Sequence, residues 1–179
     1  NNWISLDCNT FNDQRSRDVK ISDVLSGNGL VSTVPNRTPT GTVQVSADGT
    51  AIQTSIAIAA NGYYGAPTSA GPDGGNLACA WAVNNILRNA GLPTIDGDSV
   101  PLMTTALQNG QGTLVDQSAA QAGDIIIQGQ DKHVGICYNA GFTTVISNSS
   151  GRASFSNVEP VASFSRGVSP RIYQVKIKS

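Results

Sequence analysis

Residues 79–90 read CAWAVNNILRNA and have the periodicity of an amphipathic helix. Small and apolar residues recur at the three- and four-residue spacing of one helix face: Cys79, Ala82, Val83, Ile86, Leu87 and Ala90. Asn76 stands where an N-cap is expected, and Gly91 with Pro93 beyond it provides a stop signal. We therefore predict a helix that begins at Cys79 and buries this face in a core.

A long irregular stretch, residues 63–76, comes before this helix and contains several Gly and Pro residues. Irregular loops of about 14 residues are uncommon in compact domains and are usually functional. An earlier helix is predicted from Ala51 to the stop signal Asn61-Gly62. A later one is predicted from about Val100 to Asn109, with Asp98 or Ser99 as its cap.

The second half of the chain has the alternation that is typical of strands. Ile125–Ile127 follows a Gly123-Asp124 turn, residues 134–138 and 142–147 flank a second turn, and residues 171–178 alternate strongly. Helices that precede an antiparallel meander predict an α+β fold.

Cys79 has the position of a nucleophile. Backbone N–H groups and the helix dipole at a helix start stabilise a thiolate, and the Gly-rich loop offers N–H donors to an oxyanion. The single histidine, His133, opens a strand in which His133, Gly135 and Cys137 face one way. If the Cys79 helix packs on this strand, the imidazole can act as the base for the thiol.

A Cys–His pair also needs a group that orients the imidazole. Asn148 is the candidate, because an antiparallel hairpin brings the end of its strand near His133; a plain turn role is the alternative. Cys137 is predicted to be buried packing. A disulfide between Cys8 and Cys137 stays open from the sequence.

Three motifs together resemble the papain-like bacterial cell-wall peptidases of the NlpC and CHAP type. They are Asn76-Leu77-Ala78-Cys79-Ala80-Trp81-Ala82-Val83, Gln121-Ala122-Gly123-Asp124-Ile125-Ile126-Ile127 and His133-Val134-Gly135-Ile136. The resemblance covers residues 51–179 and implies a small antiparallel sheet packed on the Cys helix. Residues 1–50 are predicted to be an irregular extension with a possible β-hairpin near Thr42–Val45. Ala78-Cys79-Ala80 departs from the Asp-Cys-Ser of the NlpC branch.

The resemblance implies hydrolysis of peptide or amide bonds in peptidoglycan, with Cys79 as nucleophile, His133 as base and Asn148 in the third position. Tyr64 or Tyr63 resembles a loop tyrosine of the NlpC branch that assists the oxyanion, although core packing of both is equally open. Further expected members of the site are Asn76 and Trp81, the latter with a core role as alternative. Other readings of the same residues are a protein-directed protease or acyltransferase, and a non-catalytic binding or structural domain.

The amino-acid composition argues against several classes of partner and cofactor. Eleven Lys and Arg against twelve Asp and Glu leave a net charge of -1, which argues against a nucleic-acid partner. One His and three Cys argue against a multi-histidine or four-Cys metal site, so we predict no metal or cofactor. We expect no membrane span, since no apolar run is long enough. A secreted or periplasmic monomer is expected.

Overall fold

The computed structural model of the chain describes residues 3–6, 17–20, 51–138 and 143–176. The chain divides into two compact units, Asn1–Thr38 and Pro39–Ser179. In the first unit two short strands, β1 (Trp3–Leu6) and β2 (Arg17–Lys20), pair antiparallel. The hairpin that the sequence predicts near Thr42–Val45 lies outside the described residues.

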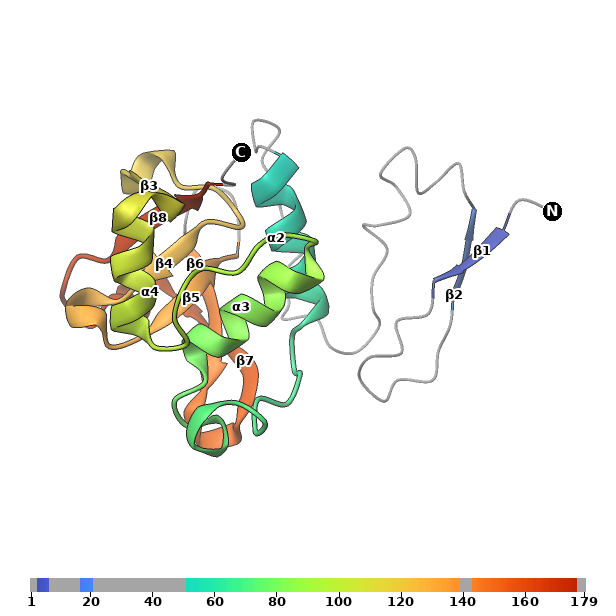
Figure 1. Cartoon of the computed structure of the whole chain (residues 1–179), viewed down its shortest axis with the longest axis horizontal. Helices are drawn as coiled ribbons and strands as arrows, with labels where there is room; N and C mark the ends of the chain where they lie inside the picture. The colour runs from blue at the N-terminus through green and yellow to red at the C-terminus, as the bar shows by residue number, and fades with distance from the viewer. Residues whose placement is uncertain (1–2, 7–16, 21–50, 139–142, 177–179) are drawn as a thin grey trace. The chain divides into compact units, whose positions relative to one another are not determined.

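The second unit combines four described α-helices with an antiparallel sheet, which confirms the α+β class (Figure 1). The helices are α2 (Ala51–Gly62), α3 (Cys79–Asn89), α4 (Val100–Ala106) and α5 (Val161–Ser165). α3 begins at Cys79, as predicted. The second predicted helix ends earlier than expected, and the chain continues in a π-helical turn, η2 (Leu107–Gln111), in which Gly110 has a φ of 110°.

Six strands form one sheet in the order β3-β8-β4-β5-β6-β7, and every neighbouring pair is antiparallel. Their bounds are β3 (Gly112–Val115), β4 (Ile125–Ile127), β5 (Val134–Cys137), β6 (Thr144–Ser149), β7 (Ser154–Pro160) and β8 (Arg171–Val175). β3, β7 and α5 were not predicted from the sequence.

Helices cover both faces of this sheet. The Tyr138 hydroxyl donates to Asn61 of α2 at 2.8 Å, so α2 and the helix α3 packed against it lie on the face of Val134 and Ile136. α5 covers the opposite face, where a buried cluster forms: Ala120, Ile126, Cys137, Val145, Val161, Phe164 and Ile172. Because side chains alternate along β5, Cys137 faces α5, whereas Val134 and Ile136 face α2 and α3.

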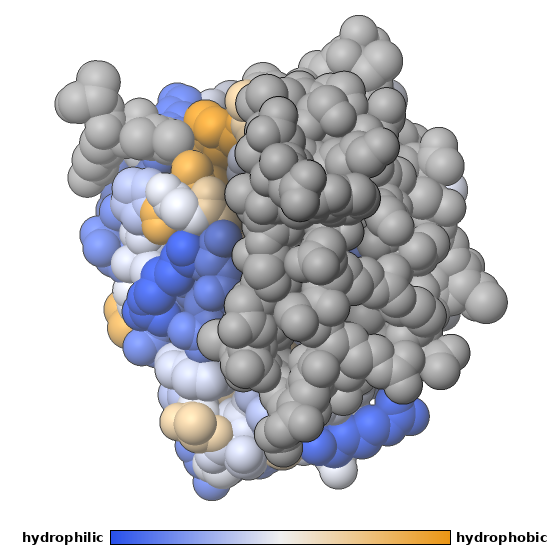
Figure 2. Space-filling view, turned by 90° about the vertical axis from the view of Figure 1, so that its right-hand side faces the viewer, coloured by the Kyte–Doolittle hydropathy of each residue, from blue (hydrophilic) through white to orange (hydrophobic). Residues whose placement is uncertain are grey.

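The described surface carries few large apolar side chains. The part that Figure 2 leaves in colour is mostly hydrophilic or neutral, with small separate apolar groups. Among the described residues no helix has both the length and the apolar character that crossing a membrane requires.

Asp124, which ends the predicted Gly-Asp turn, is a fully buried carboxyl group. The backbone N–H of Gln121 donates to it at 2.8 Å and the Gln174 side chain also bonds to it. Burial outweighs these bonds and raises the pKa of Asp124 from 3.8 to about 7. The carboxyl also faces the buried thiol of Cys137, whose pKa is raised well above the ordinary value, first by burial.

A pH-dependent stability follows from this carboxyl. Because its folded pKa lies above its unfolded value, its contribution is present in acid and is lost as the pH rises to about 7. Between pH 5 and pH 8 we expect the free energy of unfolding of the wild type, relative to Asp124→Asn, to fall by about 2 to 3 kcal/mol. Urea denaturation of both proteins at each pH measures it, and parallel pH profiles would refute it. His133 is present in both proteins, so its own pH-dependent contribution to stability, which has the opposite sign, cancels in this difference.

Candidate active site

Cys79 is the first residue of α3 and is partly exposed. Three backbone N–H groups surround its sulfur: its own, that of Ala80, and that of Val134 at the start of β5. The helix start supplies the first two, because N–H groups of a first helical turn have no partner inside the helix. The sulfur therefore lies against the peptide that joins His133 to Val134.

The thiol of Cys79 is protonated at neutral pH. Burial raises its pKa above the ordinary value of 9.0, and the hydrogen bonds from Ala80, Val134 and its own N–H offset this only in part. The N–H groups at the helix start stabilise the thiolate, as expected, but the removal of water from the sulfur outweighs them, so the pKa is raised overall.

His133 is the residue immediately before β5, and its ring packs on Phe164 of α5 with centroids 5.6 Å apart. The backbone of Asn148 forms a hydrogen bond with the ring that raises its pKa, so the ring N–H donates and the Asn148 carbonyl accepts. Burial first, and then the nearby Arg166 guanidinium, lower the pKa of His133 from 6.5 to about 4. The imidazole is consequently neutral at pH 7.

The pairing between β5 and β6 ends next to Cys79 and His133, which leaves two backbone groups available to them. The last described pair between β5 and β6 is Gly135 with Ser147. Just beyond it, the Val134 N–H lies against the Cys79 sulfur and the Asn148 carbonyl accepts from His133. If the pairing of β5 with β6 continued, this N–H and this carbonyl would form hydrogen bonds within the sheet. Because the pairing stops, both groups are available to Cys79 and His133.

Asn148 meets His133 through its backbone and not, as the sequence suggested, through its side-chain amide. The buried amide oxygen accepts from the Thr68 hydroxyl at 2.6 Å, and the amide nitrogen donates to the Gly75 carbonyl at 2.9 Å. Asn148 thus fastens the loop that leads into Cys79, while its carbonyl fixes the imidazole. The described contacts contain no hydrogen bond between the thiol of Cys79 and the His133 ring.

The two tyrosines of the loop, Tyr63 and Tyr64, interact with other aromatic and polar side chains of the domain. Tyr63 is buried, accepts a hydrogen bond from Asn85 of α3 at 3.3 Å, and meets Phe155 edge to face. Tyr64 is within electrostatic range of Tyr138, which follows the far end of β5 from Cys79. These contacts join Tyr63 to Asn85 and Phe155 and place Tyr64 near Tyr138, and the oxyanion role of Tyr64 or Tyr63 stays a prediction.

Asn76 and Trp81 flank Cys79 in sequence but have structural partners. The Asn76 amide donates to Asp73 at 2.9 Å, and the residue at the N-cap is Ala78, which makes no side-chain cap bond. The predicted capping role of Asn76 is therefore wrong. Trp81 is half-buried and packs on Gly71, where a Cβ atom would lie only 2.9 Å from the indole. It holds the loop close to α3.

The charge at Arg166 gives a measurable effect on the imidazole. Arg166 is exposed, follows α5 and has no ion-pair partner among the described residues. We expect Arg166→Gln to raise the pKa of His133, although only part of the way to 6.5 because burial is the larger cause. NMR titration is unambiguous, since the chain has one histidine. Arg152→Gln, which removes another exposed guanidinium, should leave the pKa unchanged; equal shifts in both variants would contradict a local effect.

Three neighbours of His133 were missed from the sequence: Phe164, Arg166 and the loop residue Asp131. Phe164 belongs to α5 and Arg166 directly follows it, and this helix is too short for a periodic signal. Asp131 stands two residues before His133 in the chain, but its partners come from α4 and β8. Within the described part of the chain, no cluster of three or more His, Cys, Asp or Glu residues could hold a metal ion.

Comparison of the chain with models of known protein families and with curated proteins finds no match.

Proposed function

We propose that the chain is a cysteine amidohydrolase or endopeptidase in which Cys79 is the nucleophile and His133 the base. One observation supports it above all: the Cys79 sulfur lies against the His133–Val134 peptide, among three N–H donors, while the imidazole is held by a carbonyl. Nucleophile, base, orienting group and oxyanion donors are the parts that acyl transfer requires. The resemblance of the three motifs to papain-like cell-wall peptidases points the same way.

The resting pair is neutral, which sets the order of proton transfers. One ring nitrogen of His133 donates to the Asn148 carbonyl, and we propose that the other ring nitrogen takes the thiol proton. As the proton leaves, the sulfur of Cys79 attacks the carbonyl carbon of the substrate, and the N–H groups around the sulfur are placed to stabilise the oxyanion. The imidazolium then gives its proton to the leaving amine, and a thioester remains.

Water completes the cycle. Neutral His133 takes a proton from the water that attacks the thioester, and the tetrahedral intermediate expels the Cys79 sulfur. The imidazolium returns its proton to that sulfur, which releases a carboxylic acid and restores the thiol. All three backbone donors belong to ordered elements, so they require no rearrangement during the reaction.

The substrate part of the proposal rests on the resemblance. We propose peptide or amide bonds of peptidoglycan as the target and a papain-like core as the scaffold, with a secreted or periplasmic location. An exposed apolar side chain, Leu77, stands two residues before Cys79 and is 62% exposed, so it is available for contact with a substrate. The net charge of -1 is too small to give an electrostatic guide to the substrate.

Purified peptidoglycan, with direct and with bridged cross-links, provides the test. We expect the wild type to release new amino groups, and mass spectrometry of the soluble fragments to identify the bond. A denatured protein substrate and a lipid ester, run in parallel, test the protease and acyltransferase alternatives. Hydrolysis of the protein alone would move the proposal to a protein-directed protease, whereas no reaction with any substrate would favour a binding domain.

A further inference from the structure

The loop between β4 and β5 delivers His133 and has an unusual backbone. Gln130 and Asp131, two consecutive residues with side chains, both have positive φ, 60° and 54°. Side chains rarely adopt this region, because Cβ crowds the backbone there. Such residues persist where their surroundings hold them, and they cluster at functional sites. Some fixed contact must therefore hold this loop.

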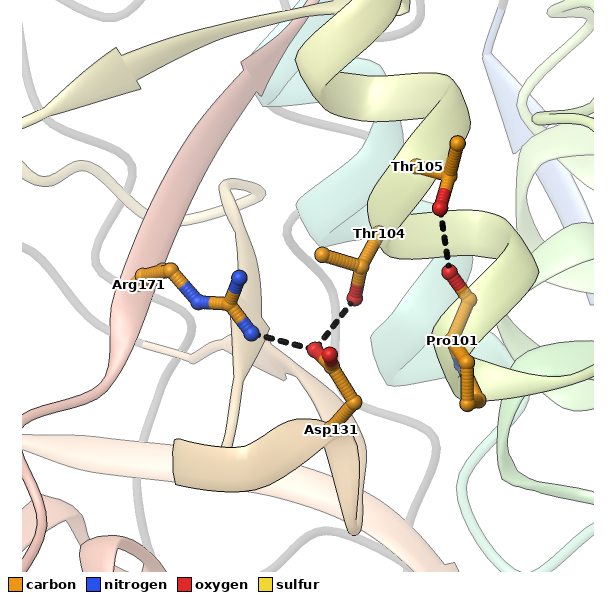
Figure 3. A network of polar contacts seen from close by, with 5 residues as sticks. All are labelled: Pro101, Thr104, Thr105, Asp131 and Arg171. Atoms are coloured by element: carbon orange, nitrogen blue, oxygen red, sulfur yellow. Dashed lines mark hydrogen bonds and ion pairs between the residues drawn. The ribbon is translucent and has the colours of Figure 1, made fainter.

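Asp131 makes that contact with two distant elements (Figure 3). Its Oδ1 accepts from the Thr104 hydroxyl of α4 at 2.8 Å and forms an ion pair with Arg171 at the start of β8. Thr104 is buried, and the side chains of Arg171 and Asp131 are only about one-third exposed. A charge-assisted bond that is partly shielded from water is stronger than a surface pair.

The anchoring reaches His133 through the backbone of the same loop. The Asp131 N–H donates to the Gln128 carbonyl at 3.2 Å, and the Gln128 N–H donates to the His133 carbonyl at 2.8 Å. The Gln128 side chain in turn donates to the carbonyl of Phe164, whose ring contacts the imidazole. Fixing Asp131 therefore fixes both the backbone of His133 and the surface on which its ring packs.

We propose that Asp131 is a positioning residue for His133, clamped by Thr104 and Arg171 so that the imidazole stays on the Asn148 carbonyl. The importance of that position for catalysis rests on the proposed function. Without the clamp the two strained residues can relax, and the imidazole loses a fixed distance to its acceptor and to the peptide beside Cys79. Asp131 touches neither group directly; it acts through the loop.

Two neighbouring threonines of α4 allow a matched test. Thr104→Val removes the donor to Asp131 with almost no change in shape, whereas Thr105→Val removes a hydroxyl that donates to Pro101 at 2.9 Å in the same helix (Figure 3). The chain has one histidine, so ¹⁵N NMR of the imidazole reports His133 alone. We expect Thr104→Val to speed hydrogen exchange of the ring N–H at least about 10-fold and to shift the ring nitrogen signals. Thr105→Val should match the wild type.

Two variants of Asp131 are expected to change the imidazole signals of His133 to different extents. Asp131→Ala removes the clamp, and we expect it to change the ring signals more than Thr104→Val does. Asp131→Asn keeps an acceptor for Thr104 and tolerates positive φ, so we expect it to restore most of the wild-type spectrum. Should Asp131→Ala fail to fold, the Thr104 and Thr105 pair still tests the proposal.

The outcomes separate this proposal from the proposed function. If Thr104→Val and Asp131→Ala leave the ring signals and the N–H exchange of His133 as in the wild type, the positioning role is wrong, whatever the activity. If the wild type hydrolyses no substrate but both variants change the imidazole, the positioning role stands and the proposed function fails. If the protein is active, we also expect Asp131→Ala to lower kcat about 10-fold or more with little change in KM.

Discussion

Cys79→Ala is expected to lower the hydrolysis of peptidoglycan by at least about 1,000-fold while the chain stays folded. The sulfur forms the covalent intermediate, and in the structure no other described thiol is placed to replace it, since Cys137 is buried between the sheet and α5. Cys79 is partly exposed and its sulfur is hydrogen-bonded by backbone N–H groups that remain in the variant, so its replacement should change the melting temperature little. Release of amino groups and thermal unfolding measure the two effects.

Cys137→Ala is the control for this variant. It removes a thiol from the buried cluster and should lower the free energy of unfolding by about 1 kcal/mol, with catalysis retained below the melting temperature. Full hydrolysis by Cys79→Ala would end the nucleophile assignment. Loss of activity in Cys137→Ala alone would move the chemistry to the other face of the sheet.

The second large effect concerns the base. We expect His133→Asn to lower kcat/KM at least about 100-fold, because the thiol has a raised pKa and loses the group that takes its proton. The wild type should also keep its activity as the pH falls from 7 to 5. The base must be neutral to act, and the pKa of His133 is about 4, so the acid limb of the profile is expected there.

An acid limb centred near 6.5 would contradict a buried, neutral imidazole. Arg152→Gln is again the control, because it alters an exposed cation and should leave the profile unchanged. The free energy of unfolding of His133→Asn is expected to depend less on pH than that of the wild type. Since the folded pKa of His133 lies below its unfolded value, the wild type loses stability as the pH falls from about 6.5 to 4, and the variant does not.

The elements with strong periodicity were predictable from the sequence. The start of α3 at Cys79 and the strand β4 at Ile125–Ile127 are confirmed, because an apolar stripe and a buried run are local signals. β7 was missed since its sequence, SFSNVEP, is mostly polar and half-buried. β3 was missed for a similar reason: it is a short edge strand whose Leu114 is 62% exposed.

The sequence predicts which residues of the site lie near each other, but not which of their atoms meet. That Asn148 lies near His133 follows from antiparallel pairing, and the structure brings the two together. Which atom of Asn148 meets the ring depends on Thr68 and Gly75, residues about 75 positions away that occupy the amide. The raised pKa of Cys79 depends likewise on how completely tertiary packing removes water, which no spacing in the sequence shows.

Rapid-quench mass spectrometry addresses the proposed thioester directly. Wild-type chain is mixed with purified peptidoglycan fragments, quenched in acid within milliseconds to seconds, digested and mapped. The mechanism predicts an acyl group on the peptide that contains Cys79, removable by neutral hydroxylamine and absent from Cys79→Ala. Release of new amino groups by the wild type with no acyl group on Cys79 at any time, and with the same rate in Cys79→Ala, would contradict it.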